Sequence, residues 1–309
     1  MKVIFVASGN KRVGGVSAFV RSQFESLREE GLEMVLSPVR GKGWRSYARA
    51  VGQLRKVVRS EHADIVHAHY SVCGVVAWLA TLGSRTRVVV SILGSFPHKN
   101  FKLKWVRFCI KHLWDATIVK SQRTADQLGM ALPVVPNGVN LSQFAIMPQD
   151  EARRACGFLP DKRYVIWCSD PSRVEKRFEW AQEAVELLKD EGVCLYPVYN
   201  KPHDEMVKYF CAADVMLLTS ESEGSPNVVK EAMACNCPVV STDVGDVKWI
   251  TQGVEGTYVA PCGDTRALAL GLAQALQLGG RTSGRERIEE YGITTECIAR
   301  KIIDIYESV

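Results

Sequence analysis

The sequence has few long apolar runs and no ordered arrangement of cysteines. No run approaches the ~20 consecutive apolar residues of a membrane-spanning helix, so no span is expected. The apolar start, residues 2–7, is too short for a signal-peptide core and is predicted to form a first strand. Only Cys235 and Cys237 lie close together among ten cysteines, and none has metal-site spacing. Such thiols are typical of small core residues in a reduced, cytoplasmic protein.

Common phosphate-binding and metal-binding motifs are also missing. Residues 9–15 have glycines at P-loop spacing, but Gly15 and Val16 occupy the positions that need Lys and Ser or Thr, which excludes a P-loop ATPase. No Gly-x-Gly-x-x-Gly follows a predicted strand, which argues against a dinucleotide-dependent oxidoreductase. No Asp-x-Asp pair is present to hold a metal against a diphosphate. We therefore expect no metal and no other cofactor.

What is present is an ordinary globular composition, 47% hydrophobic and 24% charged, in an alternating pattern of β-rich and helical segments. This alternation predicts parallel α/β domains. Strands are predicted near 2–7, 33–37, 64–68, 87–92, 116–119, 133–136, 164–168, 194–198, 214–219, 238–241 and 256–259. Helices are predicted near 16–30, 45–60, 177–190, 204–211, 226–235, 265–278 and 294–308. The expected domains are residues 1–145 and 146–295, with residues 296–309 as a last helix that could cross back to the first domain.

Charge is divided unevenly between the halves of the chain. Residues 1–145 contain 21 Lys and Arg against 8 Asp and Glu, whereas residues 146–309 contain 18 against 26. The basic first half is expected to face an anionic surface rather than nucleic acid. In residues 98–114, Phe101, Trp105 and Phe108 follow helical spacing with lysines between them. This stretch could pack on its own domain, but the charge favours peripheral contact with an anionic membrane.

Glu223 and Glu231 bracket a segment that is predicted to lead from a strand through a turn into a helix. Ser225 is expected to cap that helix and Pro226 to be its first residue. The start of a helix suits a diphosphate, and Glu231 could accept hydrogen bonds from a ribose diol while Glu223 holds a second sugar. The plainer alternative is an ordinary amphipathic helix with acidic residues near its start. The predicted donor-binding residues are Glu231, Gly224, Ser225, Pro226, Asn227, Val228 and Gly15.

Arg173 and Lys176 follow the strand predicted near 164–168. Cations on this loop could stabilise the charge that builds on a departing diphosphate. The alternative is a solvated cluster in which they pair with Glu175 and Glu179, an arrangement worth only ~0–1 kcal/mol per pair.

Histidines and glycines of the first half give weaker signals. His69 ends the strand near 64–68 and could face an acceptor, whereas a packed structural role is the ordinary alternative. Gly14, together with Gly15, would let a ligand approach the next helix, or would simply form a tight turn.

These segments together resemble glycosyltransferase family 4, whose members are retaining enzymes of the GT-B fold. The resemblance rests on the glutamates separated by seven residues and on Gly14-Gly15-Val16, Asp64-Ile65-Val66-His67-Ala68-His69, Pro136-Asn137-Gly138-Val139-Asn140, Arg173 and Lys176. It implies two Rossmann-like domains facing across a cleft, with Glu223, Arg173 and Lys176 as catalytic residues. One departure is Leu93-Gly94, where many members have His-Gly; His98 lies five residues further on and could substitute.

The function expected from this resemblance is metal-independent, retaining transfer of a sugar from a nucleotide-diphosphate-sugar to a hydroxyl of a glycan or lipid-linked acceptor. A nucleotide-sugar epimerase or phosphorylase on the same scaffold is the first alternative. A catalytically degenerate sugar-nucleotide binding protein is the second, because of Leu93. A glycoside hydrolase is disfavoured, since nothing supplies a separate acid–base pair.

Overall fold

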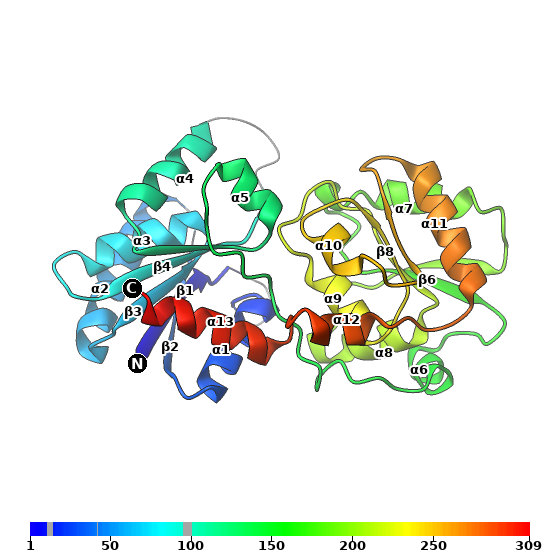
Figure 1. Cartoon of the computed structure of the whole chain (residues 1–309), viewed down its shortest axis with the longest axis horizontal. Coiled ribbons are helices and arrows are strands. Elements are labelled where there is room, and N and C mark those ends of the chain that lie inside the picture. Colours follow the sequence, from blue (N-terminus) through cyan, green and yellow to red (C-terminus); the bar gives the residue numbers. More distant parts are fainter. Residues whose placement is uncertain (11–14, 42, 95–100) are drawn as a thin grey trace. The chain divides into compact units, whose positions relative to one another are not determined.

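The computed structural model describes residues 1–10, 15–41, 43–94 and 101–309, which form two compact units. The first unit contains Met1–Asn137 and Thr295–Val309, and the second contains Gly138–Thr294. The chain therefore changes unit eight residues before the predicted position. The last helix, α13 (Thr295–Glu307), belongs to the first unit, where it packs beside α1 (Ala18–Glu29) (Figure 1).

The first unit is a parallel five-stranded sheet with helices on both faces. Its strands are β1 (Lys2–Ser8), β2 (Glu33–Val39), β3 (Ile65–His69), β4 (Arg87–Ile92) and β5 (Ala116–Val119), in the order β2-β1-β3-β4-β5. Its other described helices are α2 (Trp44–Glu61), α3 (Ser71–Thr81), α4 (Phe101–His112) and α5 (Gln122–Leu128). Side chains of β1 alternate between a core under α2, α3 and α4 and a core under α1 and α13. Burial on both faces explains why these strands are almost continuously apolar.

The second unit repeats this architecture. Its strands are β6 (Arg163–Trp167), β7 (Val193–Pro197), β8 (Val215–Leu218), β9 (Val239–Thr242) and β10 (Thr257–Ala260), all parallel in the order β10-β9-β8-β6-β7. Its helices are α6 (Gln149–Cys156), α7 (Phe178–Glu186), α8 (Met206–Ala212), α9 (Asn227–Ala234), α10 (Val247–Thr251), α11 (Thr265–Leu278) and α12 (Gly284–Glu290), with short 3-10 turns η1 (Val174–Lys176) and η2 (His203–Glu205). Its sheet is likewise buried between two apolar cores.

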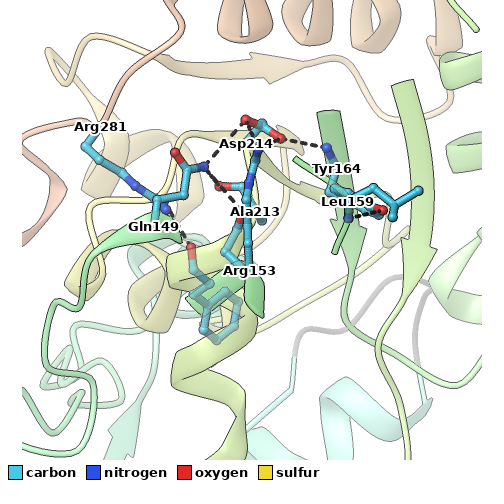
Figure 2. A network of polar contacts seen from close by, with 9 residues as sticks. Gln149, Arg153, Leu159, Tyr164, Ala213, Asp214 and Arg281 are labelled. Carbon is cyan, nitrogen blue, oxygen red and sulfur yellow. Dashed lines mark hydrogen bonds and ion pairs between the residues drawn. The ribbon is translucent and has the colours of Figure 1, made fainter. Parts of the chain in front are cut away.

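A polar network ties the amino end of β8 to its neighbours (Figure 2). Arg153 of α6 donates to both carboxylate oxygens of Asp214 at 2.8 and 2.7 Å, and the backbone N–H of Tyr164 donates to the same carboxylate at 2.6 Å. Gln149 reaches the carbonyl oxygens of residues 212 and 213. This network fastens α6 to the sheet at the edge opposite the carboxyl ends of the strands.

The predicted strand at 133–136 is wrong. Only one isolated bridge forms there, between Val119 and Val134. The N–H of Val135 donates to the carbonyl oxygen of Val119, so residue 133 would be the preceding donor to β5, and Pro133 has no backbone N–H to extend the ladder in that direction. Among the helices of the described ranges, none is long and apolar enough to cross a membrane.

Candidate functional site

The sheet of the second unit has a topological switch point between β6 and β8. From these neighbouring strands the order runs to β7 on one side and to β9 and β10 on the other. In open parallel α/β sheets, such a point leaves a crevice at the carboxyl ends of the strands, where ligands bind. The loops that follow β6 and β8 carry the predicted cations and the first predicted glutamate, so the topology brings these residues to one place.

Lys176 and Glu223 meet across this switch point. The Lys176 ammonium forms an ion pair with Glu223 Oε1, and the two side chains are only 16% and 18% exposed. Thr219, just after β8, fixes the loop that carries Lys176. Its hydroxyl accepts from Trp167 Nε1 and donates to the carbonyl oxygen of Lys176, both at 2.8 Å. The loop after β6 and the loop after β8 are thereby held together.

Arg173 does not join this pair. It donates to Glu175 two residues further on, at 2.7 Å, and both side chains are at least half exposed. A hydrogen bond from the backbone N–H of Glu175 itself, and after it the one from Arg173, lower the pKa of the Glu175 carboxyl. The structure therefore places Arg173 in the solvated cluster that the sequence offered as the alternative, and places Lys176 against the first glutamate.

Glu231 lies in α9, and its carboxylate contacts a histidine. His203 Nε2, from η2, is 2.9 Å from Glu231 Oε1, and His203 Nδ1 is 3.1 Å from the side-chain nitrogen of Gln143. The hydrogen bond to Glu231 raises the pKa of His203, against the opposing effect of burial. The Glu231 side chain is 11% exposed, so its carboxylate is largely enclosed yet reachable.

The turn between the glutamates differs from the prediction by one residue. The helix begins at Asn227, and its N-cap is Pro226, which has a non-helical ψ of 118° and makes no capping hydrogen bond with its own side chain. The N-cap is therefore one residue later than the predicted Ser225, whose hydroxyl donates to Asp246 Oδ2 at 2.6 Å and accepts from the Lys230 ammonium. Of the remaining turn residues, Gly224 is buried, whereas Asn227 and Val228 at the helix start are partly exposed.

Sequence reasoning missed Lys230 and Asp246. Lys230 is 1% exposed and its ammonium lies 3.2 Å from Asp246 Oδ2, while Asp246 is 4% exposed. The sequence did contain a signal for Lys230. This lysine directly precedes Glu231 in a mostly apolar stretch of helix, where its ammonium needs an acidic partner. Nothing local in the sequence indicated that His203 would pair with Glu231.

The predicted site residues of the first unit do not form a comparable cluster among the described residues. His69 is fully buried, with Nε2 2.8 Å from Gln23 Oε1 and its ring stacked on His67, and burial lowers the pKa of His69 to about 3. The expectation that His69 faces an acceptor is not met, because β3 is covered on both faces. Gly15 has a φ of +74° with open space around its Cα. Gly14 and His98 lie outside the described residues.

Metal ligands do not cluster in the part of the chain that the structure describes: no group of three His, Cys, Asp or Glu side chains is placed to hold an ion there.

Two family models match this chain, one for each half. The model described as "Glycosyltransferase Family 4" matches residues 15–143, and the one described as "Glycosyl transferases group 1" matches residues 161–277. The chain therefore belongs to the glycosyltransferases of family 4.

Similar proteins agree with this assignment. TuaC of Bacillus subtilis (strain 168), a glycosyltransferase named for teichuronic acid biosynthesis, is 30% identical over 61% of this chain and 55% of its own length. The chain thus spans about half of that relative. The N-acetyl-alpha-D-glucosaminyl L-malate synthase of Bacillus anthracis is 24% identical over 83% of this chain and 77% of its own length.

Solved structures establish the fold as GT-B. Anabaena HepE in complex with UDP superposes with a TM-score of 0.79 over 100% of both chains at 17% identity. Sucrose-phosphate synthase from Thermosynechococcus elongatus superposes with a TM-score of 0.77 at 16% identity, over 99% of this chain and 98% of its own. The predicted family and the predicted fold are both confirmed.

Proposed function

We propose that this protein is a retaining, metal-independent glycosyltransferase that transfers a sugar from a nucleotide-diphosphate-sugar to a hydroxyl of a glycan or lipid-linked acceptor. The observation that carries the proposal is the pair of enclosed carboxylates, Glu223 and Glu231, at the switch point of the second unit of a family 4 chain. The second unit would bind the donor and the first the acceptor.

Each side chain has a chemical role in this scheme. Glu231 accepts hydrogen bonds from the ribose hydroxyls, and Glu223 holds hydroxyls of the transferred sugar. Lys176, joined by Arg173 when a donor is bound, stabilises the negative charge of the departing diphosphate. The turn from Gly224 to Val228 completes the donor site of the second unit. Because the transition state carries more leaving-group charge than the ground state, these cations favour bond breaking.

The proposed reaction balances without a protein base. The bond between the sugar anomeric carbon and the diphosphate oxygen breaks, and the acceptor oxygen bonds to the same face of that carbon. The acceptor proton passes to the leaving phosphate oxygen. The absence of a histidine at Leu93 is compatible with this route, since the phosphate itself takes the proton.

A lipid-linked acceptor is supported by the surface of the first unit. Between residues 40 and 114 the chain has 14 Lys and Arg but only two acidic residues, Glu61 and Asp64. Lys2 donates hydrogen bonds to both carboxylates: its ammonium lies 3.1 Å from Glu61, and its backbone nitrogen lies 2.7 Å from Asp64. Arg55 and Arg107 turn inward onto backbone carbonyl oxygens. Most of the other cations stay exposed and suit an anionic surface.

The outer faces of α2 and α4 add apolar anchors to this charge. Trp44 at the start of α2 is 75% exposed, and Phe101 and Phe108 of α4 are 85% and 55% exposed. Lys104 and Lys111 are exposed at helical spacing between and after the two phenylalanines. Exposed aromatics among lysines favour peripheral binding at an anionic membrane face. None of the ten cysteines forms a disulfide, which suits a cytoplasmic location on the inner face.

The test begins with a thermal-shift screen of the full chain against UDP-, GDP- and ADP-sugars. HepE was crystallised with UDP and UDP-glucose, so a uridine donor is the first to try. Transfer is then assayed as nucleotide release that requires a hydroxyl acceptor, with product anomers assigned by NMR. Donor turnover without acceptor would indicate an epimerase, and turnover with inorganic phosphate a phosphorylase. Binding without turnover across acceptors would indicate a degenerate binding protein, and binding of no nucleotide-sugar would refute the proposal.

A further inference from the structure

A buried ion pair that has no role in the scheme above lies directly behind the donor turn. Lys230 donates to the Ser225 hydroxyl and lies 3.2 Å from Asp246 Oδ2, and Ser225 donates to that same oxygen at 2.6 Å. The lysine and the aspartate are 1% and 4% exposed. Removing two charges from water is unfavourable for each ion, and their attraction offsets this only when the geometry is good.

Stability alone does not account for this arrangement. Apolar residues of similar volume at buried ion-pair positions are often neutral or stabilising. The neighbouring positions Val229, Ala232 and Met233 of α9 are all apolar and fully buried, so an apolar residue at position 230 would suit the same core. A charged pair here instead fixes the orientation of the segments that carry it, because hydrogen bonds are directional.

The pair joins the loops after β8 and β9 at the carboxyl edge of the sheet. Ser225 belongs to the turn between the two glutamates, and Asp246 lies just after β9, at the N-cap of α10. The loops also touch through their backbones: a Cβ added at Gly245, which has a φ of +57°, would lie 2.7 Å from the carbonyl oxygen of Gly224. Both contacts fix the height of the turn above the sheet.

We propose that Lys230 and Asp246, bridged by Ser225, are positioning residues for donor recognition. They hold the turn at residues 223–226 so that Glu223 and the start of α9 face the donor in a productive geometry. The inference rests on the proposed function, and it assigns the donor specificity of that site partly to a pair that touches no substrate. It predicts that an apolar replacement keeps the fold but loosens the turn.

The test compares two double variants of the full chain. Lys230→Met/Asp246→Leu removes the positioning pair, and Arg153→Met/Asp214→Leu removes the ion pair at the opposite edge of the same sheet (Figure 2). The first variant is expected to keep its melting temperature yet lose about 10- to 100-fold in kcat/KM for the nucleotide-sugar, since small misplacements cost this much. The control is expected to keep kcat/KM, whatever happens to its stability.

Hydrogen–deuterium exchange provides a readout that needs no activity. Faster exchange confined to residues 219–230 in Lys230→Met/Asp246→Leu, with no such change in the control, would support the proposal even if the wild type transferred no sugar. A failure of the proposed function is therefore distinguishable from a failure of this inference. Unchanged exchange together with wild-type kcat/KM would overturn the positioning role.

A single hydroxyl provides a second route in case the double variant does not fold. Ser225→Ala removes the bridge, whereas Ser225→Thr keeps a hydroxyl in the same place. We expect kcat/KM to fall in the alanine variant and to recover toward wild type in the threonine variant. Equal loss in both, or loss in neither, would contradict a role for the bridging hydroxyl.

Discussion

At the scale of single residues, each glutamate of the candidate site is paired with a nitrogen-bearing side chain. Each glutamate of the pair contacts a nitrogen from a different loop, Glu223 the Lys176 ammonium and Glu231 the His203 imidazole. A carboxylate with one such partner keeps further lone pairs for ligand hydroxyls. The two carboxylates are therefore expected to contribute to different parts of donor binding.

Calorimetry with free nucleotide and with nucleotide-sugar separates these contributions. Glu231→Ala should lower the affinity for both ligands by about 10- to 100-fold, as expected for the loss of hydrogen bonds to a charged group. Glu223→Ala should weaken the nucleotide-sugar more than the bare nucleotide. Glu186→Ala, an exposed position on α7, serves as the control. Wild-type affinity of both variants for free nucleotide would show that Glu231 does not hold the ribose.

Lys176 is the cation whose loss should matter most to catalysis. Lys176→Ala should lower kcat by roughly 10²–10³-fold, by analogy with loss of one oxyanion donor. Arg173→Ala should have a smaller effect, because Arg173 is exposed and paired with Glu175. EDTA should leave wild-type activity intact. Activity that disappears with EDTA and returns with Mg²⁺ or Mn²⁺ would refute the metal-independent mechanism, and normal kcat and donor KM in Lys176→Ala would refute the role of Lys176.

His203 should make stability depend on pH. Its pKa is raised in the folded protein, chiefly by the hydrogen bond to Glu231. A raised pKa stabilises the fold fully below the unfolded value of about 6.5, and this contribution is lost as pH rises through the folded value. The melting-temperature difference between wild type and His203→Gln should therefore be larger at acidic than at alkaline pH. A difference that is constant across pH would contradict the pairing.

At the scale of elements, α4 has one face buried in the core of the first unit and one face exposed. Val106 and Cys109 are fully buried in the core of the first unit, whereas Phe101 and Phe108 face outward. Packing on the first unit and membrane contact, the two interpretations of residues 98–114, therefore concern opposite faces of the described helix. Packing accounts for the inner face, and the outer face is left for the proposed membrane contact.

Liposome binding tests the outer face of α4. Lys104→Glu/Lys111→Glu should abolish salt-sensitive binding to vesicles containing anionic lipid, since each basic residue near such a surface contributes about 1 kcal/mol. Lys189→Glu/Lys248→Glu applies the same charge change at exposed positions of the second unit and should bind like wild type. Unchanged binding by the α4 variant would rule out this face as the contact.

At the scale of the whole molecule, the last helix completes the core of the first unit. Ile298, Ala299, Ile302 and Tyr306 of α13 are buried there, and the Tyr306 hydroxyl lies 2.5 Å from His67 Nδ1. Residues separated by more than 200 positions in sequence therefore share one core. The stability of the first unit should depend on α13, and that of the second should not.

Calorimetry of the full chain can resolve this dependence, because two domains need not unfold as one. Ile302→Ala should destabilise the first unit by about 2–5 kcal/mol and shift one transition to lower temperature. Asp304→Ala, on the exposed side of α13, should shift neither. Equal shifts of both transitions in Ile302→Ala would contradict the assignment of α13 to the first unit alone.

The sequence by itself determined the family, the fold and most of the elements. Apolar runs of four to seven residues between helical stretches located the strands of both sheets, because burial on both faces leaves little choice of residue. The strand–turn–helix pattern around Glu223 and Glu231 located the candidate site, because local spacing and turn chemistry are visible in a linear chain. The false strand at 133–136 shows the limit, since a segment beside a strand extends the sheet only where its backbone N–H groups can donate, and Pro133 has none.

Only the tertiary structure decided which groups meet. The sequence predicted the same role for Arg173 and Lys176. In the structure, Arg173 pairs with Glu175 on its own loop, whereas Lys176 pairs with Glu223 from a separate loop. Ser225 was the predicted N-cap, but the N-cap is Pro226, and the Ser225 hydroxyl joins Asp246 and Lys230, which no local pattern indicated. Pairing energies depend on distance through space and on exclusion of water, and both are set by how strands distant in sequence become neighbours in a sheet.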